Sequence, residues 1–256
     1  MSQIISQYKV LNESKSIFYA WFDAMHTRID IILCDLSEEK SKEYCELIYT
    51  EIERISAITN RFDPNSELSN LNKEASKQFI KVSNELFQLI KYSVAAFTKS
   101  NGCFDITINS YNKFKEGITG IDLVEKYSSI RYVNPDIKVD LGAITKGYVL
   151  DLAVNILKEA GIESFLLNFG NSSIAAFGNH PNGNGWKVAL NNEGNFYLLH
   201  NEFLSVSGNN SLERKHIIDP HTQQFIEGKK ECAVVTSSGI EGEVLSTINF
   251  IKMAIK

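Results

Sequence analysis

The sequence lacks the short motifs that mark several familiar binding sites. It contains neither the G-x-G-x-x-G sequence of dinucleotide-binding folds nor the G-x-x-x-x-G-K-S/T phosphate loop, so any nucleotide must be held by other means. Its four cysteines lie far apart, and no C-x-x-C pair suggests a zinc site or a redox dithiol. We therefore expect buried free thiols at Cys34, Cys45, Cys103 and Cys232.

Blocks of positive charge and long apolar runs are also missing. The formal net charge is −5 and the basic residues are scattered, which argues against nucleic acid or an anionic membrane as a partner. No run of about 18 uncharged apolar residues predicts a membrane span, and the first twelve residues do not resemble a signal peptide. We expect a cytoplasmic location for the chain as written, and a periplasmic or cell-envelope location if an export signal has been removed.

Only four prolines interrupt the 256 residues, and no repeat is present. Apolar spacing predicts helices after Ser37, from about Ser83 to Asn101-Gly102, from about Ile144 to Ala160, and from about Ile240. Short β-prone runs predict strands at 27–34, 163–169, 172–177, 186–190, 196–199, 203–206 and 232–236. Because helices and strands are segregated, we expect an α+β fold with a mixed, mostly antiparallel sheet, in a single domain over 18–256 after an N-terminal extension, 1–17.

Two polar segments in the first half of the chain could bind a ligand. Phe62 could stack on a planar ring, and Ser66 with Glu67 could cap the next turn, although a capped turn without a ligand explains the same residues. Asp105 and Thr107 flank an apolar residue, so they point the same way if the backbone is extended. Their oxygens could hold a ribose or order a loop, and the residues alone leave both possibilities open.

A glycine-containing turn, VDLGAITKGY at 139–148, leads into the third predicted helix. A helix N-terminus presents free N–H groups and the positive end of the helix dipole, and Lys146 adds a cation, so a diphosphate would be stabilised there. The alternative is a buried strand-to-helix connection with a solvated lysine.

Two segments in the second half could supply a base and a metal ligand. His216, with the nearby acid Asp219, could accept a proton from a hydroxyl nucleophile, unless it is only structural. Glu243 and Thr247 stand four residues apart in the last predicted helix, so their oxygens share one face and could meet Mg²⁺. An acidic residue suited to the helix dipole would explain Glu243 equally simply.

Taken in order, these segments resemble the ApbE family, the FAD:protein FMN transferases, from about Phe22 to Ile251. The matching sequences are FDAMHT at 22–27, which resembles the family's opening strand, SELSNLN at 66–72, GCFDIT at 102–107, DLGAITKGY at 140–148 followed by Asp151, and HIIDPHT at 216–222. Each motif is degenerate, but the shared order over most of the chain makes a chance match improbable.

The resemblance implies an ApbE-like fold, related to the T-fold, and a Mg²⁺-dependent flavinyltransferase that moves FMN from FAD to a Thr or Ser hydroxyl of an acceptor flavoprotein, with release of AMP. It implies that Met25, in the opening strand, and Phe62 line the flavin pocket. The residues expected to hold the nucleotide are Ser66, Glu67, Asp105, Lys146 and Asp151. The expected Mg²⁺ ligands are the Ala143 carbonyl, Glu243 and Thr247. We interpret His216 as the base and Asp219 as the residue that orients its loop.

Three positions depart from the commonest pattern of the family. The usual G-G-D reads Gly170-Asn171-Ser172, which removes a carboxylate near the flavin pocket. The glycine after D-P-x-T is Gln223, and the metal-binding aspartate of the last helix is Glu243. Two alternatives to transfer therefore stay open: a Mg²⁺-dependent FAD pyrophosphatase that releases FMN and AMP, and a non-catalytic FAD-binding protein.

Overall fold

The structure, a computed structural model, describes residues 3–110, 117–190, 196–209, 216–228 and 230–254. The chain divides into two units. Unit 1 comprises Met1–Arg54, Lys146–Val206 and Ala233–Glu243, and unit 2 comprises Ile55–Thr145, Ser207–Cys232 and Val244–Lys256. A single domain over 18–256 stays a prediction.

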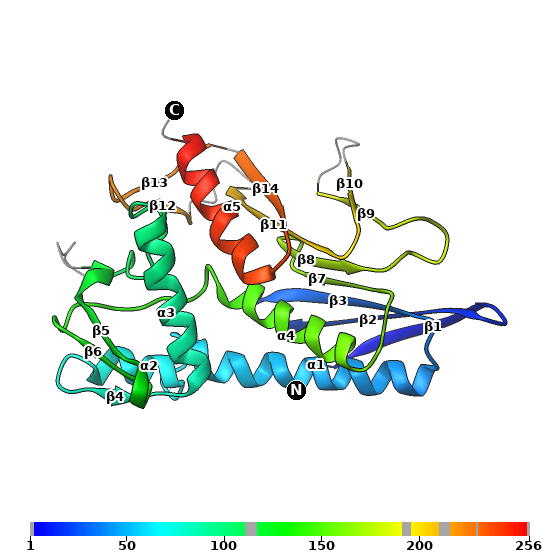
Figure 1. Ribbon diagram of the computed structural model, residues 1–256, viewed down its shortest axis with the longest axis horizontal. Helices are drawn as coiled ribbons and strands as arrows, with labels where there is room; N and C mark the ends of the chain where they lie inside the picture. Colours follow the sequence, from blue (N-terminus) through cyan, green and yellow to red (C-terminus); the bar gives the residue numbers. More distant parts are fainter. Residues whose placement is uncertain (1–2, 111–116, 191–195, 210–215, 229, 255–256) are drawn as a thin grey trace. The chain divides into compact units, whose positions relative to one another are not determined.

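A seven-stranded sheet contains most of the strands of unit 1 (Figure 1). Its order is β1 (Ile5–Asn12), β2 (Lys15–Ala24), β3 (Thr27–Cys34), β7 (Phe165–Phe169), β8 (Ser173–Phe177), β11 (Glu202–Asn209) and β14 (Lys230–Thr236). Neighbouring strands from β1 to β11 are antiparallel, which confirms the predicted α+β fold. The segment 1–17, expected to be an extension, supplies β1, which pairs with β2 from Ile5 opposite Trp21.

Helix α1 (Glu38–Thr59) and a β-hairpin of unit 1 pack against this sheet. On β2, alternate residues from Phe18 to Ala24 are buried, and the Phe22 ring meets Tyr49 of α1 edge-on at 5.0 Å. The hairpin of β9 (Trp186–Ala189) and β10 (Phe196–Leu199) packs its Trp186 against the core residues of β8 and β11. All five residues of β8 are buried, as a strand covered on both faces requires.

Two further helices of unit 1 begin close together. α4 (Thr145–Glu159) places the Lys158 ammonium 3.9 Å from the centre of the Phe177 ring of β8. α5 (Gly239–Ala254) has its first five residues in unit 1 and continues into unit 2. No helix among the described residues is long and apolar enough to cross a membrane.

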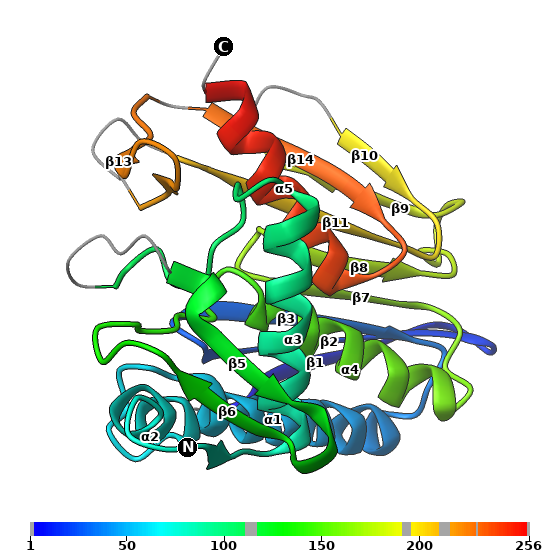
Figure 2. The same cartoon turned by 60° about the vertical axis from the view of Figure 1, so that its left-hand side comes forward.

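Unit 2 combines helices with a small three-stranded sheet (Figure 2). Its elements are α2 (Glu67–Glu74), β4 (Ile80–Lys81), α3 (Asn84–Lys99), η1 (Gly117–Gly120), β5 (Ile121–Val124), η2 (Glu125–Tyr127), β6 (Ser129–Tyr132), and the hairpin of β12 (Ile218–Asp219) and β13 (Gln224–Phe225). α3 begins after its cap Ser83 and ends before Asn101 and Gly102, both at positive φ, as the sequence predicts.

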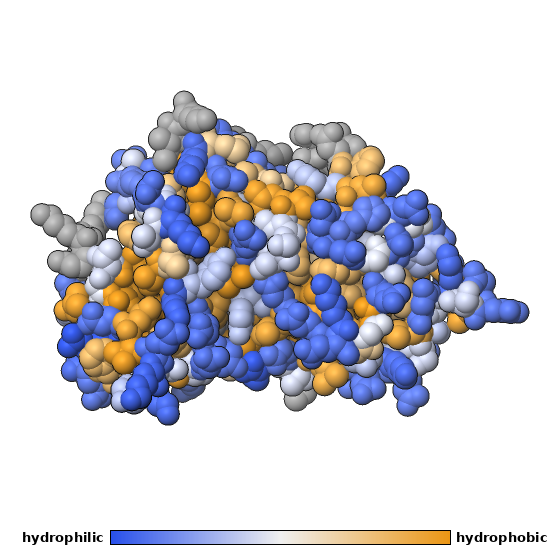
Figure 3. All heavy atoms as spheres, in the orientation of Figure 1, coloured by the Kyte–Doolittle hydropathy of each residue, from blue (hydrophilic) through white to orange (hydrophobic). Residues whose placement is uncertain are grey.

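Part of the surface of unit 2 is hydrophobic. The exposed large hydrophobic side chains of unit 2 include Phe79, Tyr92, Tyr127 and Val133. Orange atoms gather over β5 and β6 on the face drawn in Figure 3. Inside the unit, Ile226 packs with Phe250 and Ile251 of α5 to form a small separate core.

Candidate active site

The residues predicted from the sequence divide between the two units. Unit 1 holds Met25, Lys146, Asp151 and Glu243. Unit 2 holds Phe62, Ser66, Glu67, Asp105, Ala143, His216, Asp219 and Thr247. Each contact given below joins residues of the same unit.

Met25 lies in a turn and not in a strand, which corrects the expectation from the sequence. β2 and β3 are joined by two residues, Met25 and His26, with φ of 51° and 59°. Positive φ at both central positions is typical of a type I′ hairpin turn, whose twist matches that of the flanking strands. Positive φ is unusual for a residue with a Cβ, and such strain is concentrated at functional sites.

The turn that departs from the family's G-G-D lies beside this hairpin. Gly170 has φ of 67°, and a Cβ at this position would stand 2.2 Å from Oγ1 of Thr27, the first residue of β3. Asn171, also at positive φ, accepts a hydrogen bond through Oδ1 from Asn168 at 2.7 Å. Asn171 stands at the second glycine of the family's pattern and Ser172 at its aspartate. The Ser172 hydroxyl donates to the Phe169 carbonyl at 3.4 Å, so the missing carboxylate is replaced by a hydroxyl bonded within its own turn.

A largely buried ion pair joins the opening turns of α4 and α5. Lys146 Nζ donates to Glu243 Oε2 at 3.2 Å, and the two side chains are 22% and 8% exposed. The hydroxyl of Ser173 donates to Glu243 Oε1. Ser173 belongs to β8 and is fully buried, and sequence analysis missed it because a lone serine in a strand carries no motif.

Two glycines allow this pair to form. A Cβ on Gly147 would stand 2.3 Å from the Gly239 carbonyl oxygen and 2.6 Å from Glu243 Cγ, so the first turns of the two helices are in direct backbone contact. Only a residue without a side chain permits so close an approach. The contact brings Lys146, one residue before Gly147, within reach of the Glu243 carboxylate.

Asp151 caps the helix that carries Glu243. Its Oδ1 accepts from the Gly239 N–H at 2.7 Å, and its Oδ2 accepts from the Ile240 N–H at 2.9 Å and from the Ser238 hydroxyl at 3.0 Å. A carboxylate here satisfies free N–H groups at the positive end of the helix dipole. Burial raises the pKa of Asp151, although these hydrogen bonds oppose the rise.

Glu67 has a corresponding role in unit 2. Its Oε1 accepts from the Ser83 N–H and its Oε2 accepts from the Ser83 hydroxyl at 2.6 Å. Because Ser83 is itself the cap of α3, Glu67 ties the start of α2 to the start of α3. Ser66 is buried and caps α2 by accepting from the Ser69 N–H at 3.0 Å, so the cap predicted at this turn is confirmed.

Asp105 and Thr107 bind each other in a turn. Asp105 Oδ1 accepts from the Thr107 N–H at 2.7 Å and from its hydroxyl at 2.6 Å. Burial raises the pKa of Asp105, and the bonds from Thr107 work against that rise. Of the two possibilities that the sequence leaves open, the structure contains the ordered loop.

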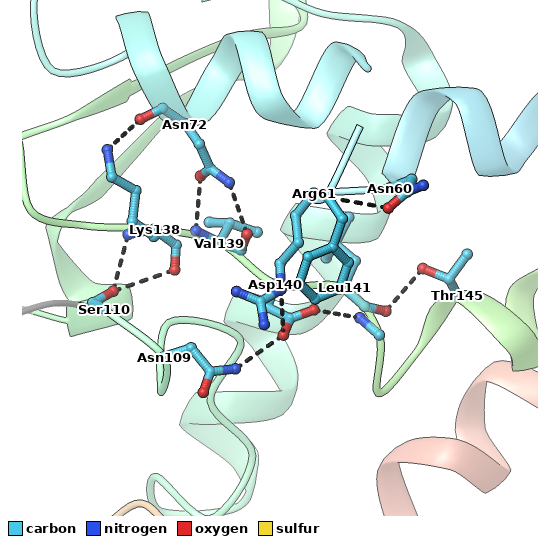
Figure 4. A network of polar contacts seen from close by, with 12 residues as sticks. Asn60, Arg61, Asn72, Asn109, Ser110, Lys138, Val139, Asp140, Leu141 and Thr145 are labelled. Carbon is cyan, nitrogen blue, oxygen red and sulfur yellow. Dashed lines mark hydrogen bonds and ion pairs between the residues drawn. The ribbon is translucent and has the colours of Figure 1, made fainter. Parts of the chain in front are cut away.

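A polar network surrounds Asp140 in unit 2 (Figure 4). Arg61 Nε lies 3.0 Å from Asp140 Oδ2, which also accepts from Asn109 Nδ2 at 2.9 Å. Asp140 Oδ1 accepts from the Gly142 N–H at 2.9 Å. The guanidinium carbon of Arg61 sits 4.4 Å from the centre of the Phe62 ring, which is 72% exposed. The network thus backs one face of an exposed aromatic ring with a fixed cation.

Asn72 holds the segment that carries Asp140. It accepts from the Val139 N–H at 2.8 Å and donates to the Val139 carbonyl at 2.9 Å, as a neighbouring strand would. Lys138 Nζ donates to the Asn72 carbonyl at 2.6 Å (Figure 4). The conformation of the loop before α4 is therefore set by a side chain 67 residues earlier in the chain.

Asp219 organises the segment that follows His216. It is buried, and it accepts from the His221 N–H at 3.0 Å and from the Thr222 hydroxyl at 2.9 Å. His216 is exposed, two residues before β12. Gln223, at the position of the family's usual glycine, has φ of 61°, so a glycine-like backbone persists without the glycine.

A second histidine emerges from the structure in the same segment. His221 Nε2 lies 3.0 Å from the Asn101 carbonyl oxygen, and its Nδ1 lies 3.3 Å from Asp219 Oδ1. On α5, the Thr247 hydroxyl lies 3.0 Å from that of Ser207. The Asp219 carboxylate thus contacts His221, a histidine to which the sequence analysis gave no role.

Comparison with known proteins identifies the family. A model of the ApbE family matches residues 25–255. The chain belongs to the ApbE family. This ApbE-family chain is 24% identical over 215 residues to the FAD:protein FMN transferase of Chlamydia muridarum (strain MoPn / Nigg), covering 73% of the chain and 67% of that protein. It is 21% identical over 253 residues to the FAD:protein FMN transferase of Escherichia coli (strain K12), covering 83% and 72%.

Solved structures of ApbE proteins share its fold. The flavin transferase ApbE from Vibrio cholerae matches with a TM-score of 0.79 over 98% of this chain and 87% of that one, at 18% identity. The ApbE protein from Thermotoga maritima matches with a TM-score of 0.78 over 93% and 87%, also at 18% identity. The arrangement of helices and strands is therefore that of ApbE structures.

The expected Mg²⁺ ligands of this ApbE-family chain are all oxygen atoms, which is the donor type that Mg²⁺ prefers. They are one carboxylate (Glu243), one hydroxyl (Thr247) and one backbone carbonyl (Ala143). No group of three or more His, Cys, Asp or Glu side chains that could hold a metal occurs among the described residues. One carboxylate with neutral oxygens fits Mg²⁺ because this ion usually completes its shell with water and substrate phosphate.

Proposed function

We propose that this chain transfers the FMN moiety of FAD to a Thr or Ser hydroxyl of an acceptor protein and releases AMP, in a Mg²⁺-dependent reaction. The observation that carries the proposal is the match to the ApbE family over residues 25–255, which include every residue given a role below. The two relatives described above are both named FAD:protein FMN transferase.

In this proposal the flavin ring stacks on Phe62, whose exposed ring is backed by Arg61. Met25 contributes its polarizable thioether to flavin binding. Lys146 and the first turn of α4 bind the diphosphate, since an ammonium and free N–H groups both stabilise negative charge. Ser66, Glu67, Asp105 and Asp151 keep the surrounding loops and helix ends in place through the hydrogen bonds described above.

The metal would be held by the Ala143 carbonyl, Glu243 and Thr247, and would neutralise charge on the diphosphate. The acceptor hydroxyl oxygen forms a bond to the FMN phosphorus, and the bond from that phosphorus to the AMP oxygen breaks. His216 accepts the hydroxyl proton, and AMP leaves with the electron pair of the broken bond. Asp219 keeps the segment after His216 in place by accepting hydrogen bonds from the His221 N–H and the Thr222 hydroxyl.

The direct test follows the two products together. Purified protein is incubated with FAD, with and without Mg²⁺, alone and with an acceptor domain bearing a modifiable Thr or Ser. We expect AMP only when acceptor and Mg²⁺ are both present, with the acceptor heavier by one FMN residue. AMP and free FMN without acceptor would instead make the chain an FAD pyrophosphatase, and FAD binding without AMP would make it a flavin-binding protein.

The proposed base is tested by comparing two histidines in one segment. His216→Ala should leave FAD affinity nearly unchanged and lower transfer by about 10²-fold, the usual contribution of a general base. His221→Ala is the matched variant, because His221 contacts Asp219 and the Asn101 carbonyl. A larger loss in His221→Ala than in His216→Ala would transfer the role of base to His221.

A further inference from the structure

Glu243, the proposed metal ligand, already binds a cation of its own chain. Lys146 Nζ donates to Oε2 at 3.2 Å, and the Ser173 hydroxyl binds Oε1. Both charged side chains are largely buried, so water screens their attraction only weakly. A metal ion approaching this carboxylate would meet the positive charge of Lys146 at short range.

We propose that Lys146 and a divalent cation exclude each other at Glu243, so that the metal binds tightly only when the diphosphate of FAD draws Lys146 away. The first half rests on the observed ion pair, and the second half rests on the proposed function, which places the diphosphate at Lys146. Lys146 would then exchange one negative partner for another as substrate binds. The chain would bind metal and nucleotide cooperatively.

A buried hydroxyl near Glu243 supports the idea that the hydrogen bonds around this carboxylate rearrange. Ser205 lies opposite Ser173 in the pairing of β11 with β8, and both are fully buried. Ser205 Oγ has no hydrogen-bond partner among the described residues, although it would stand 2.4 Å from a Cβ placed on Gly242. A buried hydroxyl without a partner is costly, and a rearrangement of the carboxylate or an entering water would satisfy it.

Ser173 has a separate part in this exchange. Its hydroxyl fixes one oxygen of Glu243 while Lys146 holds the other. When Lys146 leaves, Ser173 keeps the carboxylate oriented for the incoming cation. Ser173 is therefore a positioning residue that acts through Glu243.

The test measures Mn²⁺ binding to the full chain by electron paramagnetic resonance, without FAD. We expect weak binding to the wild-type protein and binding at least about 10-fold tighter to Lys146→Gln, because the competing charge is gone. Lys40→Gln is the matched control: it removes one positive charge from an exposed position on α1 and should bind Mn²⁺ like the wild type. Equal or weaker binding to Lys146→Gln would overturn the proposal.

Repeating the titration with FAD tests the second half. FAD should tighten Mn²⁺ binding to the wild type by about 10-fold or more, and by clearly less in Lys146→Gln. An equal gain in Mn²⁺ affinity in both proteins would mean that FAD acts only through direct contact between the metal and the diphosphate. That result would overturn the second half of the proposal. If the wild-type protein transfers FMN but Lys146→Gln binds Mn²⁺ no more tightly than the wild type does, this inference alone is refuted. If Lys146→Gln binds Mn²⁺ more tightly but the wild-type protein transfers no FMN, the proposed function alone is refuted.

A charge-conserving variant covers the case in which Lys146→Gln does not fold, which circular dichroism would reveal. Lys146→Arg keeps the charge, and its forked guanidinium can engage a carboxylate more firmly than an ammonium can. We expect Mn²⁺ binding without FAD to weaken by about threefold or more relative to the wild type. Tighter or unchanged binding in Lys146→Arg would contradict competition at Glu243.

Discussion

Each unit holds a carboxylate beside a cation, and the two pairs differ in what else supports the carboxylate. Asp140 in unit 2 forms an ion pair with Arg61 and accepts hydrogen bonds from the Gly142 N–H and the Asn109 amide. Glu243 in unit 1 is more deeply buried and accepts from Lys146 and the Ser173 hydroxyl. A carboxylate held by fixed amide groups can keep its position when its cation is removed, whereas a buried one depends strongly on its partner's charge.

The strongest way to break the unit 1 pair is to separate the helices that carry it. In Gly147→Ala the new Cβ would meet the Gly239 carbonyl oxygen at 2.3 Å, and backbone cannot move aside as a side chain can. We expect a loss of about 3 kcal/mol in the free energy of unfolding, typical of severe overpacking, measured by urea denaturation. Gly183→Ala is the control, because nothing lies within 4 Å of its Cβ position and the site is exposed. Equal losses in the two variants would refute the close-contact explanation.

The two remote helix caps offer a sharper comparison between the units. Asp151→Ala leaves the N–H groups of Gly239 and Ile240 and the Ser238 hydroxyl without their acceptor, while Glu67→Ala affects only Ser83. We expect losses of about 2 kcal/mol for Asp151→Ala and about 1 kcal/mol for Glu67→Ala, from the usual value of a charged cap. Thermal unfolding of both variants at pH 7 would check the order, and the reverse order would contradict it.

The smallest expected effect concerns the unit 2 pair. Arg61→Met should cost little stability, because Asp140 keeps its amide donors and both side chains of the pair are partly exposed. If Phe62 stacks on the flavin as proposed, losing the cation behind its ring should weaken FAD binding by about 3- to 10-fold, the range of a cation–π contact. Quenching of flavin fluorescence on titration would measure this. Arg61→Lys should keep most of the affinity, and identical binding to all three proteins would remove Arg61 from the flavin site.

Local signals in the sequence predicted local structure well. The boundaries of α3 follow from Ser83, which caps its first turn, and from Asn101-Gly102, which tolerate a left-handed backbone. The strand at 27–34 follows from alternation of apolar and polar residues. Such features need only neighbouring residues, so spacing along the chain reveals them.

Contacts between residues far apart in the sequence could not be predicted from these local patterns. Lys146 and Glu243 were both candidates, yet nothing in their spacing shows that they bind each other across 97 positions. Asp151 was also a candidate, and nothing in its spacing shows that its oxygens cap a helix that begins 88 residues later. Met25 was placed in a strand because FDAMHT resembles the opening strand of the family, and no glycine or asparagine marks the turn that Met25 and His26 form.

Strand β1 covers the edge of β2 in the seven-stranded sheet. β1 is an outer strand of the seven-stranded sheet, and its register is interrupted between Val10 and Asn12. It covers one edge of β2, where the buried Phe18 and Phe22 lie. An irregular outer strand is a poor template for another chain, whereas a bare, regular and apolar one invites aggregation. Removing the residues before Phe18 would therefore expose the edge of β2 to pairing with other chains. We expect such a truncation to lower solubility before it affects catalysis.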